Sequence, residues 1–141
     1  MKSTLYPYLN FNGPDTAEAM KFYQSVLGGK LTMQTFGEAG MAKTDEEKDY
    51  VIHAMLESDG ITFMASSGHP GQPVKFGDNI SMSISGSDEE TLRKYFDGLS
   101  AGGTVNMPLA KQFWGDIYGQ LTDKFGVHWM VNITSEPQKK K

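Results

Sequence analysis

Two histidines in apolar, strand-like segments are the side chains of this chain best suited to acid–base chemistry. Imidazole exchanges its proton near neutral pH and can act as a general base, a general acid or a hydrogen-bond donor. His53 lies in segment 50–58 and His128 in segment 127–133, and both segments alternate side chains between two faces. We therefore consider His53 as a catalytic residue. The alternative is a histidine that is packed and hydrogen-bonded in its strand without a catalytic part.

Several other kinds of reactive group are missing from the sequence. There is no cysteine, which excludes thiol nucleophiles, disulfides and iron–sulfur clusters. No glycine-rich nucleotide loop and no G-x-S-x-G nucleophile elbow occurs. The net charge of -4 argues against nucleic acid or an anionic membrane as a partner. Because no apolar run is long enough to cross a membrane and no apolar signal region opens the chain, we expect a cytoplasmic protein.

The first half of the chain predicts the element order βαβββ. Asp15 with Glu18 three positions later forms a capping-box pattern at the start of a helix. Asp59-Gly60 is typical of a hairpin turn. The apolar face expected for the helix consists of Ala19, Phe22, Tyr23 and Val26. The predicted strands are 5–11, 30–36, 50–58 and 61–66, with a loop at 37–49.

The second half repeats this order after a Gly- and Pro-rich linker, 67–78. Ser87 with Glu90 predicts the helix start. The apolar face expected for this helix consists of Leu92, Tyr95, Phe96 and Leu99. The predicted strands are 79–85, 104–109, 117–122 and 127–133, with a loop at 110–116.

Residue matches between the halves indicate a duplication, although two unrelated α+β halves remain the alternative. Gly28-Gly29 followed by Met33 recurs as Gly102-Gly103 followed by Met107, and Gly60-Ile61-x-Phe63-Met64 recurs as Gly126-Val127-x-Trp129-Met130. We predict one α+β domain, 1–141, built from two tandem βαβββ modules that form a cupped mixed sheet with the helices on its outer face. The modules span about 1–66 and 79–135, joined by the linker 67–78 and followed by a tail, 136–141.

Strand alternation assigns side chains to the two faces of the predicted sheet. Ile52, Ala54 and Leu56 suit the helix side, as do Ile80 and Val127 in the second half. The other face carries tyrosine, methionine, serine, amide and imidazole groups, which suit a moderately polar organic ligand. The expected ligand-pocket residues are Tyr8, Asn10, His53, Met55, Met64, Ser66, Ser81, Trp114, Gln120, His128 and Met130. Trp114 lies in a loop, where packing is the alternative to ligand contact.

The chain resembles the vicinal oxygen chelate superfamily of glyoxalase I, bleomycin-resistance proteins and extradiol dioxygenases. The segments Tyr6–Phe11, Trp114-Gly115 and Asp123–Trp129 resemble its PhnB-like branch, often labelled "3-demethylubiquinone-9 3-methyltransferase-like". The resemblance implies the cupped fold and a homodimer. It also implies metal ligands on the first and fourth strands of each module, where this chain has Tyr6, Met64, Asn79 and Met130.

None of those four side chains is a good ligand for a divalent ion, which prefers imidazole or carboxylate. We therefore expect a protein that binds a small organic molecule in the cup without cofactor or metal. A nonstandard metal site containing His53 and His128 stays open. The alternative function is an enzyme of isomerase, lyase or dioxygenase type that uses His53 as acid or base or in such a metal site. A protein whose main role is assembly is a third hypothesis.

Overall fold

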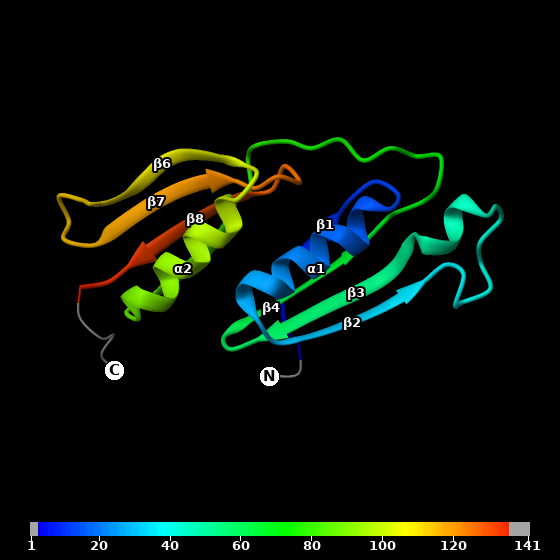
Figure 1. The fold of residues 1–141 in the computed structure, drawn as a ribbon, viewed down its shortest axis with the longest axis horizontal. Coiled ribbons are helices and arrows are strands. Elements are labelled where there is room, and N and C mark those ends of the chain that lie inside the picture. The colour runs from blue at the N-terminus through cyan, green and yellow to red at the C-terminus, as the bar shows by residue number, and fades with distance from the viewer. Residues whose placement is uncertain (1–2, 136–141) are drawn as a thin grey trace. The chain divides into compact units, whose positions relative to one another are not determined.

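The computed structural model describes residues 3–135, and the chain divides between Lys75 and Phe76 into two compact parts, here called the N-terminal and C-terminal units (Figure 1). The predicted tail 136–141 lies outside the described residues. The N-terminal unit contains β1 (Tyr8–Asn10), α1 (Asp15–Leu27), β2 (Lys30–Thr35), the short 3-10 helix η1 (Glu46–Asp49), β3 (Val51–Ser58) and β4 (Ile61–Ser66). The C-terminal unit contains β5 (Met82–Gly86), α2 (Glu89–Ser100), β6 (Thr104–Lys111), β7 (Ile117–Thr122) and β8 (His128–Ile133).

Each unit forms a four-stranded mixed sheet with the same topology. The strand orders are β1-β4-β3-β2 and β5-β8-β7-β6. In each sheet the first strand pairs in parallel with the fourth, and the other neighbours are antiparallel. The predicted α+β class and the tandem βαβββ order are therefore confirmed, with one sheet in each unit.

In the N-terminal unit, α1 packs against one face of its sheet (Figure 1). Tyr23 is fully buried and meets Phe63 of β4 edge to face, with ring centroids 5.6 Å apart. The buried helix residues are Thr16, Ala19, Met20, Tyr23 and Leu27. The buried face of α1 is therefore rotated slightly about the helix axis from the predicted one, because Phe22 and Val26 are only half-buried. Thr16, Met20 and Leu27 fit the same helical spacing as Ala19 and Tyr23, so periodicity alone could not choose between the two faces.

Both predicted helix caps were wrong by one residue. Asp15 is the first helical residue of α1, and Pro14 takes the cap position without a side-chain hydrogen bond. In α2 the cap is Asp88, whose carboxylate accepts hydrogen bonds from the Thr91 backbone N–H at 3.2 Å and hydroxyl at 2.8 Å. Those two bonds, the hydroxyl first, lower the pKa of Asp88 from its usual value. Ser and Asp are both preferred at this position, and neighbouring candidates cannot be ranked by residue type.

The C-terminal unit has its core between α2 and the sheet. Leu92, Phe96 and Leu99 of α2 are buried, and so are Leu121, Trp129, Val131 and Ile133 of the strands. The prediction that Ile80 joins this core was wrong, because β5 begins only at Met82 and Ile80 is 77% exposed. Tyr95 and Val127 are half-buried. Strand β6 runs to Lys111, two residues past its predicted end at 109.

A register shift in β3 changes which side chains face the helix. Gln34 of β2 pairs with His53, but the next residue, Thr35, pairs with Val51. The extra residue, Ile52, is half-buried, whereas Val51 is fully buried. Ile52 was therefore wrongly assigned to the helix-facing core, because a β-bulge interrupts strict alternation.

The repeated Gly-Gly pairs have a common structural cause. Gly29 has φ +91°, and a Cβ there would overlap the backbone of Glu57 in the neighbouring strand. A Cβ on Gly103 would overlap the backbone of Thr122 in the same way. The second glycine of each pair thus permits the chain leaving the helix to enter the sheet closely beside its neighbour.

Candidate functional site

Six of the predicted site residues lie on adjacent strands of the N-terminal unit. Tyr8 on β1 is the cross-strand partner of Met64 on β4, and Met64 is the partner of Met55 on β3. These side chains alternate with the buried residues that face α1, so they lie on the helix-free face of the sheet. The six residues are Tyr8, Asn10, His53, Met55, Met64 and Ser66.

The most specific contact on this face joins Tyr8 and His53. The Tyr8 hydroxyl lies 3.1 Å from Nδ1 of His53, and the two ring centroids are 5.8 Å apart. Both residues are exposed. The hydroxyl orients the imidazole, so one ring nitrogen is held while Nε2 is left for a ligand. The arrangement has the geometry needed for a general acid or base, which a histidine buried by packing would lack.

The C-terminal unit contains a hollow of about 340 Å³ on the helix-free face of its sheet. Gln120 of β7 and Met130 of β8 are cross-strand partners within it. Asp78 and Asn106 also line the hollow but were absent from the predicted site. The full lining is Asp78, Ser81, Asn106, Gln120, Leu121, His128, Trp129 and Met130.

Sequence reasoning missed these two residues for different reasons. Asp78 had been assigned to the linker, where side-chain direction has no period to follow. Asn106 lies on β6, and alternation along the predicted strand 104–109 was a signal that could have placed it. Ser81, Gln120, His128 and Met130 were predicted and do meet in this hollow.

Two short hydrogen-bond chains order the polar side chains of the hollow. The Thr122 hydroxyl lies 3.0 Å from Nδ1 of His128 and donates to Oδ1 of Asn106 at 2.9 Å. Gln120 Nε2 donates at 3.0 Å to the hydroxyl of Tyr118, which in turn donates to the Met130 sulfur at 3.5 Å. The second chain is the weaker, because a thioether is a poor acceptor.

Trp114 does not line the hollow. It lies in the turn between β6 and β7, half exposed, where its ring meets Tyr118 edge to face at 6.1 Å between centroids. Its neighbour Phe113 is 96% exposed. Trp114 therefore contacts Tyr118, and Tyr118 in turn accepts a hydrogen bond from the predicted site residue Gln120.

The four positions where related proteins would hold a metal do not fit a divalent ion here. Tyr6 precedes β1 and Asn79 precedes β5, and neither carries a carboxylate or imidazole. Met64 and Met130 supply neutral thioethers, and the Met130 sulfur already accepts the hydrogen bond from Tyr118. Hard and borderline ions bind such groups poorly.

The two histidines considered for a nonstandard metal site lie in different units, His53 in the N-terminal and His128 in the C-terminal one. Within residues 3–135, no three His, Asp or Glu side chains gather as a metal-binding group would require. In the same part of the chain, neither α1 nor α2 has the length and apolar character needed to cross a membrane.

The polar segment 37–49, expected to be a loop, is held by its own side chains. The Glu38 carboxylate accepts from the backbone N–H and hydroxyl of Thr35, and these bonds, the backbone one first, lower its pKa. The Tyr50 hydroxyl donates to Glu46 at 3.1 Å, and desolvation together with that bond raises the pKa of Tyr50.

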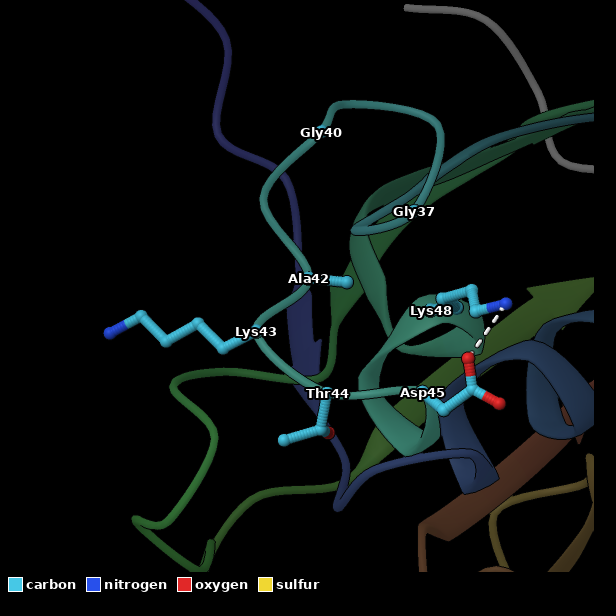
Figure 2. A pocket seen from close by; sticks show the side chains of 7 residues that line it. All are labelled: Gly37, Gly40, Ala42, Lys43, Thr44, Asp45 and Lys48. Carbon is cyan, nitrogen blue, oxygen red and sulfur yellow. Dashed lines mark ion pairs between the residues drawn. The ribbon is translucent and has the colours of Figure 1, made fainter.

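Figure 2 shows a second hollow, of about 350 Å³, on this segment. The Lys48 ammonium pairs with Asp45 at 2.9 Å, while the Lys43 side chain points away from the hollow. The Lys48 ammonium is therefore paired within the segment itself.

Asp123, in the turn between β7 and β8, is 3% exposed, and both of its carboxylate oxygens accept hydrogen bonds. Oδ1 accepts from the backbone N–H groups of Phe125 and Val127, and Oδ2 accepts from Nε1 of Trp129 at 2.8 Å. The Asp123–Trp129 segment therefore closes a hairpin and anchors the largest core side chain.

Comparison with known proteins agrees with this architecture. The chain is 29% identical to protein YjdN of Escherichia coli (strain K12), over 94% of this chain and 96% of YjdN. The crystal structure of protein PA1353 from Pseudomonas aeruginosa is 37% identical, with a TM-score of 0.84 over 94% of this chain and 98% of that one. The PhnB protein from Bacillus cereus is 27% identical, with a TM-score of 0.75 over 94% of this chain and 100% of its own.

The family model described as Glyoxalase/Bleomycin resistance protein/Dioxygenase superfamily matches residues 6–131. That range contains all the strands and helices of both units except the last two residues of β8, and it contains all eleven predicted site residues. The chain therefore belongs to the glyoxalase/bleomycin resistance/dioxygenase superfamily, and its likeness to the PhnB protein supports the PhnB-like branch.

Proposed function

We propose that this protein binds a small, moderately polar organic molecule on the helix-free face of its sheet, held by side chains rather than by a metal ion. The observation that carries the proposal is the hollow of about 340 Å³ in the C-terminal unit. Its size is in the range of sites for small organic ligands. Its polar groups are pre-oriented by hydrogen bonds, which lowers the entropy lost on binding.

The chemistry of the lining supports binding by hydrogen bonds beside an apolar side chain. Met130 supplies the apolar surface, while Gln120, Asn106 and His128 supply polar groups. A ligand that satisfies those groups is favoured over analogues that leave them unpaired, because a buried unpaired polar group is costly.

A ligand screen on the whole chain tests the proposal. Compounds that raise the melting temperature are then titrated into the wild type and the Gln120→Met variant, which removes the amide at similar volume. We expect about tenfold weaker binding to that variant. The matched control is Gln112→Met, outside the hollow, which should bind as the wild type does. Equal affinity of all three proteins for every stabilising compound would contradict the proposal.

A second function is favoured by the Tyr8–His53 contact in the N-terminal unit. Under this alternative the chain is an enzyme of isomerase, lyase or dioxygenase type, and His53 transfers a proton while Tyr8 holds its ring. Compounds found by the screen would be incubated with the protein and followed by NMR. The alternative requires turnover that His53→Gln abolishes and that Tyr8→Phe reduces. Absence of turnover for every bound compound would leave only the binding function.

We also propose a homodimer. The support for it in this chain is the exposed aromatic pair Phe113 and Trp114, since large exposed apolar side chains often mark contact surfaces. Sedimentation analysis of the wild type and a Phe113→Ser variant tests this. A monomeric wild type would contradict the homodimer.

A further inference from the structure

We propose that the hollow of the C-terminal unit selects ligands that combine a positive charge with several hydrogen-bond donors, such as amidines, guanidines and amines. This inference rests on the proposed function and narrows it to a ligand class. The lining side chains use some of their hydrogen-bond donors on one another, and the groups left for a ligand are mainly acceptors.

The Thr122 hydroxyl determines which ring nitrogen of neutral His128 carries the hydrogen. A threonine hydroxyl has one hydrogen. Thr122 donates it to Oδ1 of Asn106, an atom that can only accept, at 2.9 Å. Toward Nδ1 of His128, 3.0 Å away, the same hydroxyl must therefore accept. Neutral His128 then carries its hydrogen on Nδ1, and Nε2 offers a lone pair to the ligand.

The amide of Gln120 is oriented by the Tyr118 hydroxyl. Its Nε2 donates to the Tyr118 hydroxyl at 3.0 Å, and Tyr118 uses its own hydrogen toward the Met130 sulfur. The amide nitrogen of Gln120 is therefore the atom that faces the Tyr118 hydroxyl. The amide oxygen of Gln120 is then the atom left to accept from a ligand.

The charge of the lining is negative when His128 is neutral. Asp78 adds a carboxylate, and no lysine or arginine is among the residues that line the hollow. The acceptors offered are Nε2 of His128, Oε1 of Gln120 and the Asp78 carboxylate. The donors are the Asn106 amide nitrogen and the Ser81 hydroxyl. A ligand rich in donors and positively charged complements this set, and an amidinium can also bind the carboxylate through two parallel bonds.

A set of three probes of nearly equal shape tests the ligand class. Benzamidine is a cation with four N–H donors, benzamide is neutral, and benzoate is an anion without donors. Each is titrated into the ¹⁵N-labelled full chain, and the amide signals of residues 120, 128 and 130 are followed. We expect benzamidine to bind about fivefold more tightly than benzamide, and benzoate to bind most weakly.

Two variants test whether the Asp78 carboxylate causes the preference for benzamidine. Asp78→Asn should bring the benzamidine affinity to that of benzamide, while Asp97→Asn, an equal charge change on the exposed surface of α2, should leave it unchanged. Benzamide or benzoate binding as tightly as benzamidine at these signals would overturn the ligand class and leave the proposed binding function intact. An absence of shifts at the three signals with all probes would overturn both for this hollow.

Discussion

Trp129 Nε1 donates a hydrogen bond to the buried carboxylate of Asp123 at 2.8 Å, within a single β-hairpin. The other carboxylate oxygen accepts from the backbone N–H groups of Phe125 and Val127. The presence of Asp123 and Trp129 in a segment that resembles the PhnB-like branch is thus explained by folding. It shapes the turn between β7 and β8, and it orients the strand on which His128 and Met130 line the hollow.

Replacing Asp123 should destabilise the fold. Asp123→Asn keeps the shape but presents an amide N–H₂ where three N–H donors converge, so at least one donor loses its partner. We expect a loss of about 1–3 kcal/mol in the free energy of unfolding, and a larger loss for Asp123→Ala. Urea unfolding monitored by tryptophan fluorescence measures it. Asp97→Asn is the control for the charge change, and a midpoint of Asp123→Asn equal to that of the control would contradict the role of the carboxylate.

Much of this fold could be predicted because the chain repeats itself. The Gly-Gly pairs, with Gly29 and Gly103 at the positions of close approach, mark the same step of each unit. The hairpins around Gly60 and Gly126 were predicted from their turn residues, and the strands β4 and β7 beside them have the predicted bounds.

The wrong predictions concern residues at which strand alternation is interrupted or does not apply. Ile80 is apolar but precedes β5, so alternation did not apply to it. The bulge at Ile52 depends on how β2 pairs with β3, which no local pattern records. In the hollow, Asp78 comes from a segment without strand or helix, so its side chain could not be assigned to a face. Residues on regular strands, such as Gln120 and Met130, could be assigned to a face by alternation.

Ser67, expected to begin the linker, is a buried hydrogen-bond centre. Its hydroxyl donates to the carbonyl of Gly13 at 2.8 Å and accepts from the Val51 N–H and the Thr16 hydroxyl, each at 2.9 Å. Ser67→Ala leaves these buried groups unpaired, and we expect a loss of about 1–3 kcal/mol in unfolding free energy. Urea denaturation checks this against Ser25→Ala, an exposed serine of α1. Equal midpoints for the two variants would show that Ser67 contributes nothing special.

Asp88 gives a stability effect with a defined pH window. Because hydrogen bonds from Thr91 lower its pKa in the folded state, the charged carboxylate stabilises α2 at pH values above the ordinary aspartate pKa of 3.8. This stabilisation is lost as the pH falls through the lowered folded-state value. Asp88→Asn can still cap the helix but cannot titrate.

The comparison of wild type with Asp88→Asn isolates that effect from the other carboxylates of the chain. We expect the urea midpoint of the wild type, relative to this variant, to be constant from about pH 7 to about pH 5 and to fall below about pH 4. Asp88→Ala should have a lower midpoint at neutral pH because the cap is gone. A difference between wild type and Asp88→Asn that stays constant down to about pH 3 would contradict the role of the charged cap.

The side chains at the four positions where the resemblance implies metal ligands lead to a prediction about metal binding. Tyr6, Met64, Asn79 and Met130 offer no carboxylate or imidazole, so added divalent ions should not stabilise the fold through them. We expect elemental analysis of the purified, tag-free protein to find no stoichiometric metal. The melting temperature should be the same with Zn²⁺, Mn²⁺, Ni²⁺ or a chelator. The variants His53→Ala and His128→Ala, melted with the same ions, serve as controls for a site built on imidazole. A stoichiometric metal, or an ion-dependent rise in melting temperature that either variant removes, would instead establish a nonstandard metal site and favour the enzyme over the binding protein.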